Sequence, residues 1–557
     1  LSAPNEIVAA DGTVNQTGGT NTVANLLTIN GTYALSGGSL NVNGGMDNSG
    51  TLNLAGGTLG GSGVLTNNGS MSGFGTIAGT GGFVNNALFS QSGGAVTLSN
   101  TGANANYGNM DLLTGNQFRL NGAGAALSNS GTINLNNAVI SGTGTLNNSA
   151  GGVIAGRGAI SSNFANSGGT VVVGPGTTNI VKAFNNSGLI DLTGPTASLS
   201  GGVITNTGTV QGAGTVGNNI NNAGIIEALG GTLNLSGVSV NNNSAGLMAA
   251  STGNKILVTN GLASNSGTIN LTGGTFDNNG HVATNSGQIS GYGTVRTGGL
   301  TNSGNVLLTG GTSTVNGDVI NSASGKITVA YNPAIFTGNV TNYGTVKTTN
   351  TTVSFAGIYT ELGAYISDPS NNYFTNLTVG TTGYLTGGAG DNWFVSGNFT
   401  NNSLMNTDWN TALAYLEFNG AGGHNFSLAG SDNGAITGGY ADNFSWGTFE
   451  LASGNTLSLF DGNAASGAAL YVGNILGLSI SGGQVTNITG DGYNIYYLAS
   501  LSGNSYLNGL DYDLMNGGRL MAVTGGTPVP EPSTLLLLGS GLAGFAMTRL
   551  RKFRRSA

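Results

Sequence analysis

The sequence predicts an all-β protein, a parallel β-helix (β-solenoid) with coils of about 20 residues. Three observations predict it: a repeated segment, an alternation of apolar side chains within that segment, and a low content of charge. The segment reads NSGTINL at residues 265–271, with copies NSGTLNL at 48–54 and NSGTINL at 129–135. Self-similarity at a fixed period of this size is typical of proteins built from stacked repeats.

The leading asparagine of each copy marks the period. It recurs about every 20 residues, at positions 30, 48, 67, 86, 106, 129, 148, 166, 186, 206, 222, 243, 265, 285, 302, 321 and 342. If the coils continue to about residue 525 there are roughly 25 of them, and the stack forms a rod on the order of 120 Å long.

Within a copy the apolar residues alternate with polar ones. Ile269 and Leu271 point one way, and Thr268 and Asn270 point the other, which is the period of a half-buried strand. Glycine and asparagine bracket each short strand and favour turns. Variants with Gly-x-Gly, such as residues 212–214, predict a tight corner in the coil.

Charged residues make up 6% of the chain, against about a quarter in ordinary domains. In a solenoid a repeated charge would face its own copy one strand spacing away, at a cost of roughly 1 kcal/mol per pair. Asparagine and threonine can fill such rows and bond along the axis. The net charge of −8 argues against nucleic-acid binding, and the absence of cysteine excludes disulfides and thiolate metal sites.

The composition divides the chain into four parts. Residues 1–29 are predicted to form an N-terminal cap with a degenerate first coil, and residues 30–350 the regular solenoid repeats. All three tryptophans lie beyond residue 350, so residues 351–526 are predicted to continue the solenoid with wider, aromatic-rich and less regular coils. Residues 527–557 differ from all of these.

This C-terminal segment begins with three prolines in five positions, which cannot continue a sheet. An apolar run from Leu535 to Met547 follows, which is short for a permanent membrane span. A basic cluster then ends the chain: Arg549, Arg551, Lys552, Arg554 and Arg555. We expect residues 533–550 to form a short helix that anchors the chain transiently in the inner membrane, with the bases on the cytoplasmic side.

The order of these features resembles the PEP-CTERM sorting signal. The motif itself is Val529, Pro530, Glu531, Pro532 and Ser533. The resemblance implies an exported protein of a Gram-negative bacterium that is processed by an exosortase, an integral-membrane transpeptidase, and that resides at the cell surface or in the exopolysaccharide matrix. More loosely, the body resembles the β-helix passengers of haemagglutinins and autotransporters.

Candidate binding residues lie in the aromatic-rich part. Trp393 and Trp409 are candidate glycan contacts that could stack on a sugar ring, with Asp391, Asp408 and His424 beside them in a cleft. The alternative interpretation is that the aspartates form turns and the aromatics fill a wider core. Residues 387–393 approach a calcium-binding nonapeptide with Asp and Asn in the wrong order, so no metal or cofactor is expected.

We therefore expect a non-enzymatic structural protein of the bacterial surface or exopolysaccharide matrix, bound weakly and repeatedly to polysaccharide. One alternative is a fibre subunit that associates with itself end to end, which electron microscopy would reveal. Another is a polysaccharide-active β-helix enzyme, for which Asp391, Asp408 and Glu417 are the residues to substitute.

Overall fold

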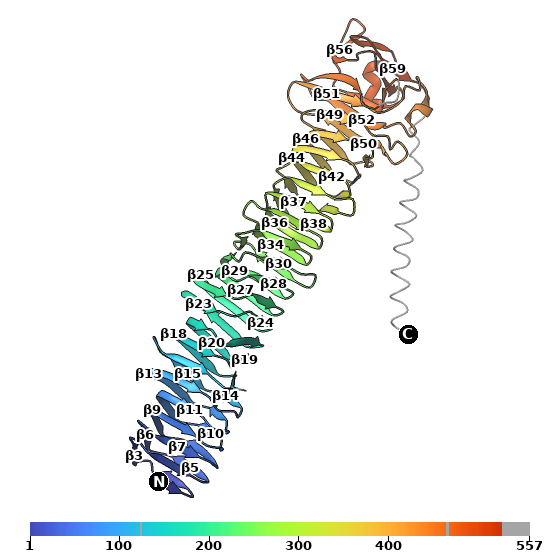
Figure 1. Cartoon of the computed structure of the whole chain (residues 1–557). Coiled ribbons are helices and arrows are strands. Elements are labelled where there is room, and N and C mark those ends of the chain that lie inside the picture. The colour runs from blue at the N-terminus through green and yellow to red at the C-terminus, as the bar shows by residue number, and fades with distance from the viewer. Residues whose placement is uncertain (123–124, 464–466, 526–557) are drawn as a thin grey trace, which may run out of the picture. The chain divides into compact units, whose positions relative to one another are not determined.

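The computed structural model describes residues 1–122, 125–463 and 467–525 (Figure 1). The chain divides into two units, Leu1–His281 and Val282–Ala557, and each forms its own stack of coils. The fold is an all-β parallel β-solenoid of about 21 turns with coils roughly 20 residues apart, which confirms the predicted class. The turns are fewer than the 25 expected because the C-terminal coils are longer than the repeat period.

A coil of the first unit contains a short strand and a long one. β17 (Ala126–Asn129) is short and ends on a marker asparagine, whereas β18 (Thr132–Gly142) is long and bends part-way. They pair in parallel with their equivalents one coil further on, β19 (Thr145–Ser149) and β20 (Val153–Ile160). Strands of successive coils therefore lie side by side and satisfy each other's backbone groups.

Side-chain alternation along β18 follows the prediction. Ile133 and Leu135 are fully buried, while Thr132 and Asn134, which alternate with them, are half-buried on the outer side. The Gly-x-Gly variant bends a strand without ending it. In β11 (Ser70–Ile77), Gly73 and Gly75 have φ of 105° and 147°, and the register with the next coil shifts between them. The predicted corner is thus a bulge inside a continuous strand.

The marker asparagines line the interior of the first unit as a continuous row, the asparagine ladder. In each pair the side-chain Nδ2 donates to the Oδ1 of the next asparagine, over 2.6 to 2.8 Å. The amide nitrogens also donate to backbone carbonyl oxygens, for example from Asn67 to Leu88 at 2.9 Å and from Asn206 to Ile225 at 3.2 Å. The members are Asn48, Asn67, Asn85, Asn106, Asn129, Asn148, Asn166, Asn186, Asn206, Asn222, Asn242 and Asn265.

Three of the asparagines that mark the period are not members of the ladder. The buried residue is Asn85 rather than Asn86, and Asn242 rather than Asn243, because burial alternates along the preceding strand residues. Asn30 is exposed, and the apolar Ile29 occupies its place in the row. The ladder therefore begins at Asn48, whose buried Oδ1 is left without a hydrogen-bond partner.

The glycine two residues after the asparagine is required by the stacking of coils. A Cβ atom on Gly208 would collide with the backbone oxygen of Gly188 in the preceding coil, and one on Gly188 with that of Gly169. The Asn-x-Gly signature thus combines an interior hydrogen-bond relay with a close backbone approach that excludes other residues.

In the second unit the ladder recurs and then ends on a carboxyl group. Asn285, Asn302, Asn321 and Asn342 are linked by the same 2.7 Å amide bonds. The next position is Glu361, at the end of β44 (Thr352–Glu361), whose two oxygens accept from Asn342 Nδ2 at 2.7 and 3.0 Å. Tyr359 Oη and the Gly363 N–H also donate to this carboxyl group, both over 2.7 Å.

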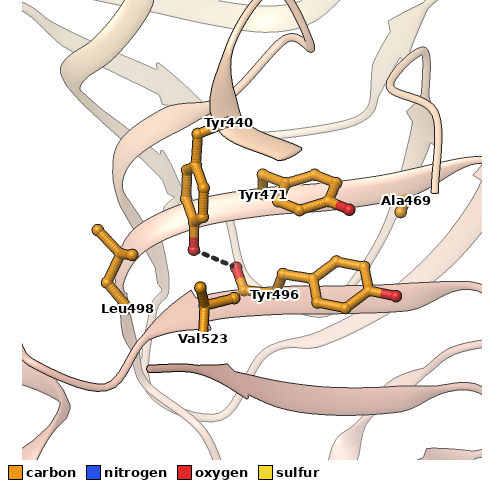
Figure 2. Packing of buried hydrophobic residues seen from close by; sticks show 6 residues of the cluster. All are labelled: Tyr440, Ala469, Tyr471, Tyr496, Leu498 and Val523. Carbon is orange, nitrogen blue, oxygen red and sulfur yellow. Dashed lines mark hydrogen bonds between the residues drawn. The ribbon is translucent and has the colours of Figure 1, made fainter. Parts of the chain in front are cut away.

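Coils after β48 (Asn392–Val395) are longer and less regular, as predicted for the C-terminal coils; Glu417 and its register partner Glu450, for instance, are 33 residues apart. Figure 2 shows how one insert is held: Tyr440, in the 3-10 helix η1 (Thr437–Tyr440), packs on Tyr471 and Tyr496. The rings of Tyr471 and Tyr496 stack with centroids 4.5 Å apart. Tyr440 Oη donates to the carbonyl oxygens of Val472 at 3.1 Å and Tyr496 at 3.3 Å. Aromatic packing thus replaces the asparagine ladder as the interior of these coils.

The predicted sorting segment 527–557, including the short membrane helix, lies outside the described residues. Among the residues that are described, no helix is long and apolar enough to cross a membrane. The predicted boundaries at residues 29 and 350 stay predictions. Parallel pairing already begins at β1 (Ser2–Ala3), which pairs with β4 (Thr20–Val23).

Candidate functional site

The outward face of five consecutive strands in the second unit gathers two rows of side chains. These strands are β44, β46 (Asn371–Val379), β48 (Asn392–Val395), β50 (Thr411–Phe418) and β52 (Trp446–Leu451). Parallel register aligns their outward residues. The first outward row is Thr352, Asn371, Asn392, Tyr415 and Thr448, and the second is Ser354, Tyr373, Phe394, Glu417 and Glu450.

Three aromatic rings meet on this face. Tyr373 and Phe394 stack with centroids 4.5 Å apart and planes inclined by 15°, and the ring of Tyr415 meets Phe394 edge-on at 6.0 Å. Tyr373 is 37% exposed, and the other two rings are half-buried. Aromatic rings held open to solvent on a rigid sheet offer an apolar surface with a polar edge, which suits ligands of mixed character.

Next to the rings two carboxylates occupy one row. Glu417 and Glu450 are register partners, and the Tyr415 hydroxyl is 2.9 Å from the Glu417 Oε2 and 2.7 Å from the Glu450 Oε2. Burial raises the pKa of the Tyr415 phenol, and its bonds to the two carboxylates raise it further, so it remains a donor. This pair departs from the pattern that keeps like charges out of stacked rows.

Replacing Glu450 by glutamine should raise the free energy of unfolding by roughly 0.5–1 kcal/mol at low salt, because it removes like charges directly opposite each other. The new side chain would retain an oxygen that accepts from Tyr415. Urea unfolding measures the change, and high salt should shrink it. The matched control is Glu227→Gln, since the register partners of Glu227, Gln211 and Ala249, are uncharged. An equal gain in both variants would refute the repulsion.

Beside the first outward row lies a groove of about 600 Å³, the corner groove, formed where successive coils turn between strands. Its lining consists of Tyr331, Pro333, Asn350, Thr351, Thr352, Pro369, Ser370, Asn371, Gly390 and Asn392. None of these ten described residues is charged. The groove thus offers proline and tyrosine rings together with amides and hydroxyls.

Two residues of the groove have a positive φ, which is unfavourable for most side chains. Tyr331 has φ of 66° and is 67% exposed, and Asn350, one coil further on, has φ of 45°. Positive φ is tolerated by asparagine but is an outlier for a bulky aromatic residue, at a cost on the order of 1 kcal/mol. The bond from Tyr331 N–H to the Thr349 oxygen, 2.9 Å, helps to hold the turn.

Hydrogen bonds fix the floor of the groove. Asn392 Nδ2 donates to Asn371 Oδ1 at 2.7 Å, and Thr351 Oγ1 donates to the backbone oxygen of Asn332 at 2.6 Å. Among the hydrogen bonds of the described residues, none uses the Nδ2 of Asn371 or the side-chain amide of Asn350. These groups remain able to bond a ligand.

The predicted glycan contacts Trp393 and Trp409 are not on the surface. Both indoles are 0% exposed; Trp393 packs against Trp446 at 5.5 Å, and Trp409 Nε1 donates to Thr411 Oγ1 at 2.8 Å. Neither ring can therefore stack on a sugar, and that prediction is wrong. The alternative interpretation, aromatics that fill a wider core, is correct for both.

The predicted cleft of Asp391, Asp408 and His424 does not form a common site either. Asp391 is buried and accepts from Ser367 Oγ and from the N–H groups of Ser370 and Gly388, at 2.9 and 2.8 Å for the latter two. Burial raises its pKa, and these hydrogen bonds lower it in part. Its role is to shape the loop beside the corner groove.

His424 is buried elsewhere, with Nδ1 2.7 Å from the Gly397 oxygen and Nε2 3.1 Å from the Gly420 oxygen, while Asp408 is exposed. Within the described part of the chain, no group of three or more histidine, aspartate or glutamate side chains could hold a metal ion. In residues 387–393, the segment similar to a calcium-binding nonapeptide, the Asp391 carboxylate accepts hydrogen bonds from backbone N–H groups.

Sequence reasoning missed the corner groove and the Glu417–Glu450 pair. Strand alternation carried part of the signal, since Tyr373 and Phe394 alternate with buried residues. The pairing of Glu417 with Glu450 joins positions 33 residues apart, which the 20-residue period cannot reveal.

Comparison with known families identifies one segment. Residues 528–552 match the PEP-CTERM protein-sorting motif, in agreement with the resemblance seen in the sequence. No curated protein matches the chain significantly. The motif marks an exported protein of the kind found in Gram-negative bacteria and implies processing by an exosortase.

Proposed function

From an exported β-solenoid body joined to a PEP-CTERM motif, we propose that this chain is a non-enzymatic structural protein of the cell surface or exopolysaccharide matrix. The observation that carries the proposal is this combination in one chain. A solenoid displays the same outward positions coil after coil, and the sorting motif delivers that surface outside the cell.

The chemistry of the outward rows supports binding to polysaccharide. On β18, Asn134 is half-buried on the outer side and bonds to Asn109 and Asp111 of the preceding coil at 3.1 and 2.7 Å. Such rows of amides, hydroxyls and occasional carboxylates offer hydrogen bonds to sugar hydroxyls without strong charge. Each contact is weak, and repetition along the coils increases the total affinity.

The experiment is retention of the purified full chain on the producer's own exopolysaccharide, together with the phenotype of a deletion. We expect retention that grows with the length of the polysaccharide, and a deletion strain whose matrix is weaker or thinner. A protein that is not retained, in a strain whose matrix is unchanged by the deletion, would refute the proposal.

The C-terminal segment should control where the protein resides. Replacing Glu531 by alanine, or the basic residues by glutamine, should block processing by the exosortase and leave a longer product at the inner membrane. Intact mass and cell fractionation measure this. The control is a conservative Thr527→Ser substitution, outside the matched residues 528–552, and unchanged mass and location in the Glu531→Ala variant would contradict the role.

One observation favours a second candidate, a polysaccharide-active enzyme. Glu417 and Glu450 share a single phenol and lie beside exposed rings, and paired carboxylates are the groups that glycoside hydrolysis uses. Release of reducing ends from neutral and acidic glycans tests it, with Glu417→Gln as the inactive control. If the wild type releases reducing ends and Glu417→Gln does not, the chain is an enzyme and the proposed structural role is refuted.

A further inference from the structure

We infer that the corner groove is a binding site for an uncharged segment of a polysaccharide. The inference rests on the proposed function and names where on the chain, and by which chemistry, the polysaccharide is held. It places the contact at Tyr331, Asn350 and Asn371, three residues from three successive coils of the second unit.

The lining of the corner groove is uncharged. Its ten residues include prolines, asparagines, threonines, a serine, a glycine and a tyrosine, so the groove has no charged side chain of its own. A charged ligand would lose hydration on entering and gain no opposite charge in return. A neutral chain of hydroxyl groups loses less, and amides and hydroxyls can replace the water it gives up.

Apolar and polar groups both line the corner groove. Pro333, Pro369 and the ring of Tyr331 present C–H and ring surface to the groove. Asn350 and the Asn371 Nδ2 offer hydrogen-bonding groups that no bond among the described residues uses. Sugar rings have the complementary arrangement, with apolar C–H faces and polar edges, and binding sites generally combine apolar walls with a few placed polar groups.

The backbone of Tyr331 has an unfavourable conformation. A tyrosine with φ of 66° that is 67% exposed gains little from burial in the fold. Glycine would be easier to accommodate at this φ, so the ring is present at a cost to stability. Residues held in such conformations cluster at ligand sites, because their strain fixes the direction of a side chain that a ligand needs.

The groove also continues onto the aromatic face. Asn371 and Tyr373 are outward residues of β46, two positions apart, and Asn392 and Phe394 are their register partners on β48. A chain lying in the groove across several coils can therefore pass onto the stacked rings of Tyr373 and Phe394. This length favours a polysaccharide segment over a single sugar.

The test measures the affinity of the full chain for uncharged hexasaccharides of glucose, β-linked and α-linked, and for hexagalacturonate as the acidic comparison, by calorimetry. We expect one neutral hexasaccharide to bind about tenfold or more tighter than hexagalacturonate, with little dependence on salt. Tyr331→Gly should weaken this binding at least about tenfold. Because glycine relieves the positive φ, the variant should fold and melt no lower than wild type.

The matched control is Tyr343→Ala, another tyrosine of the second unit, 50% exposed and outside the groove, which should bind as wild type does. Asn371→Leu is a second groove variant and should also weaken binding. Hexasaccharide binding that is absent in wild type, equal in Tyr331→Gly, or stronger for hexagalacturonate would overturn the inference.

Retention on the producer's matrix, measured in parallel, separates the two claims. Retention of wild type and Tyr331→Gly alike, with no effect on hexasaccharide binding, would overturn the groove and leave the structural role standing. Loss of retention in Tyr331→Gly alone would support both. No retention of either protein, together with a matrix that the deletion leaves unchanged, would overturn the structural role.

Discussion

Replacing Asn186 by leucine should lower the free energy of unfolding of the first unit by roughly 2–6 kcal/mol. Asn186 is fully buried; it accepts from Asn166 Nδ2 at 2.6 Å and donates to Asn206 Oδ1 at 2.7 Å. Leucine is similar in size but leaves a donor on one side and an acceptor on the other without partners. Each unsatisfied buried group costs about 1–3 kcal/mol, and urea unfolding measures the sum.

The adjacent residue gives a matched control. Asn185 is exposed, so Asn185→Leu makes the same chemical change on the outer side of the same strand, β24 (Phe184–Asn186), and should alter stability by no more than about 0.5 kcal/mol. Since a solenoid can unfold locally, hydrogen exchange of the flanking coils should show the loss near residue 186. Equal effects of the two substitutions would show that the ladder contributes nothing.

Replacing Glu361 by glutamine should remove most of the pH dependence of stability of the second unit between about pH 4.5 and 8. Burial raises the pKa of Glu361 to about 8, and the hydrogen bonds from Asn342, Tyr359 and Gly363 lower it only in part. The folded state therefore favours the protonated carboxyl. Its contribution is fully present below the unfolded pKa of 4.5 and is lost as the pH rises through 8.

Over that window the wild type should lose up to roughly 1.4 kcal/mol per pH unit from this group. Glutamine can accept from Asn342 and Gly363 and donate to Tyr359 Oη without ionising. Urea unfolding from about pH 5 to 9 should therefore show Glu361→Gln close to wild type at the acidic end and more stable near pH 8. Glu227→Gln is the control, and a Glu361→Gln curve parallel to the wild-type curve would contradict the account.

Much of the fold could be predicted because its signals are local. The period gives the coil, the alternation in NSGTINL gives the inward residues, and glycine after asparagine gives the close approach of coils. The markers Asn86 and Asn243 missed the ladder because adjacent asparagines stand there, two at 85–86 and three at 241–243. Alternation from Phe83, which is buried, already selects Asn85, and alternation from Val240 selects Asn242.

The site was harder to predict because its residues lie in turns and because its two carboxylates pair across a coil of 33 residues. Tyr331 and Asn350 follow the register partners Ala330 and Thr349, so the period aligns them, but nothing in the repeat indicates their positive φ. Trp393 was predicted to contact a glycan because it is a large aromatic residue. It alternates with Asn392 and Phe394, however, and lies on the same side of the strand as the buried Val395. The outward ring of this strand is Phe394, and strand alternation would have identified it.

The asparagine ladder has a consequence for how the first unit can change in length. Each member from Asn67 to Asn242 accepts one amide N–H bond from the preceding asparagine and donates one to the next, so a whole coil is an interchangeable part. Deleting one coil, for instance between Asn186 and Asn206, would place the Nδ2 of the asparagine before the deletion beside the Oδ1 of the asparagine after it. Duplication of whole coils would likewise preserve every interior bond, whereas gaining or losing part of a coil would break the relay.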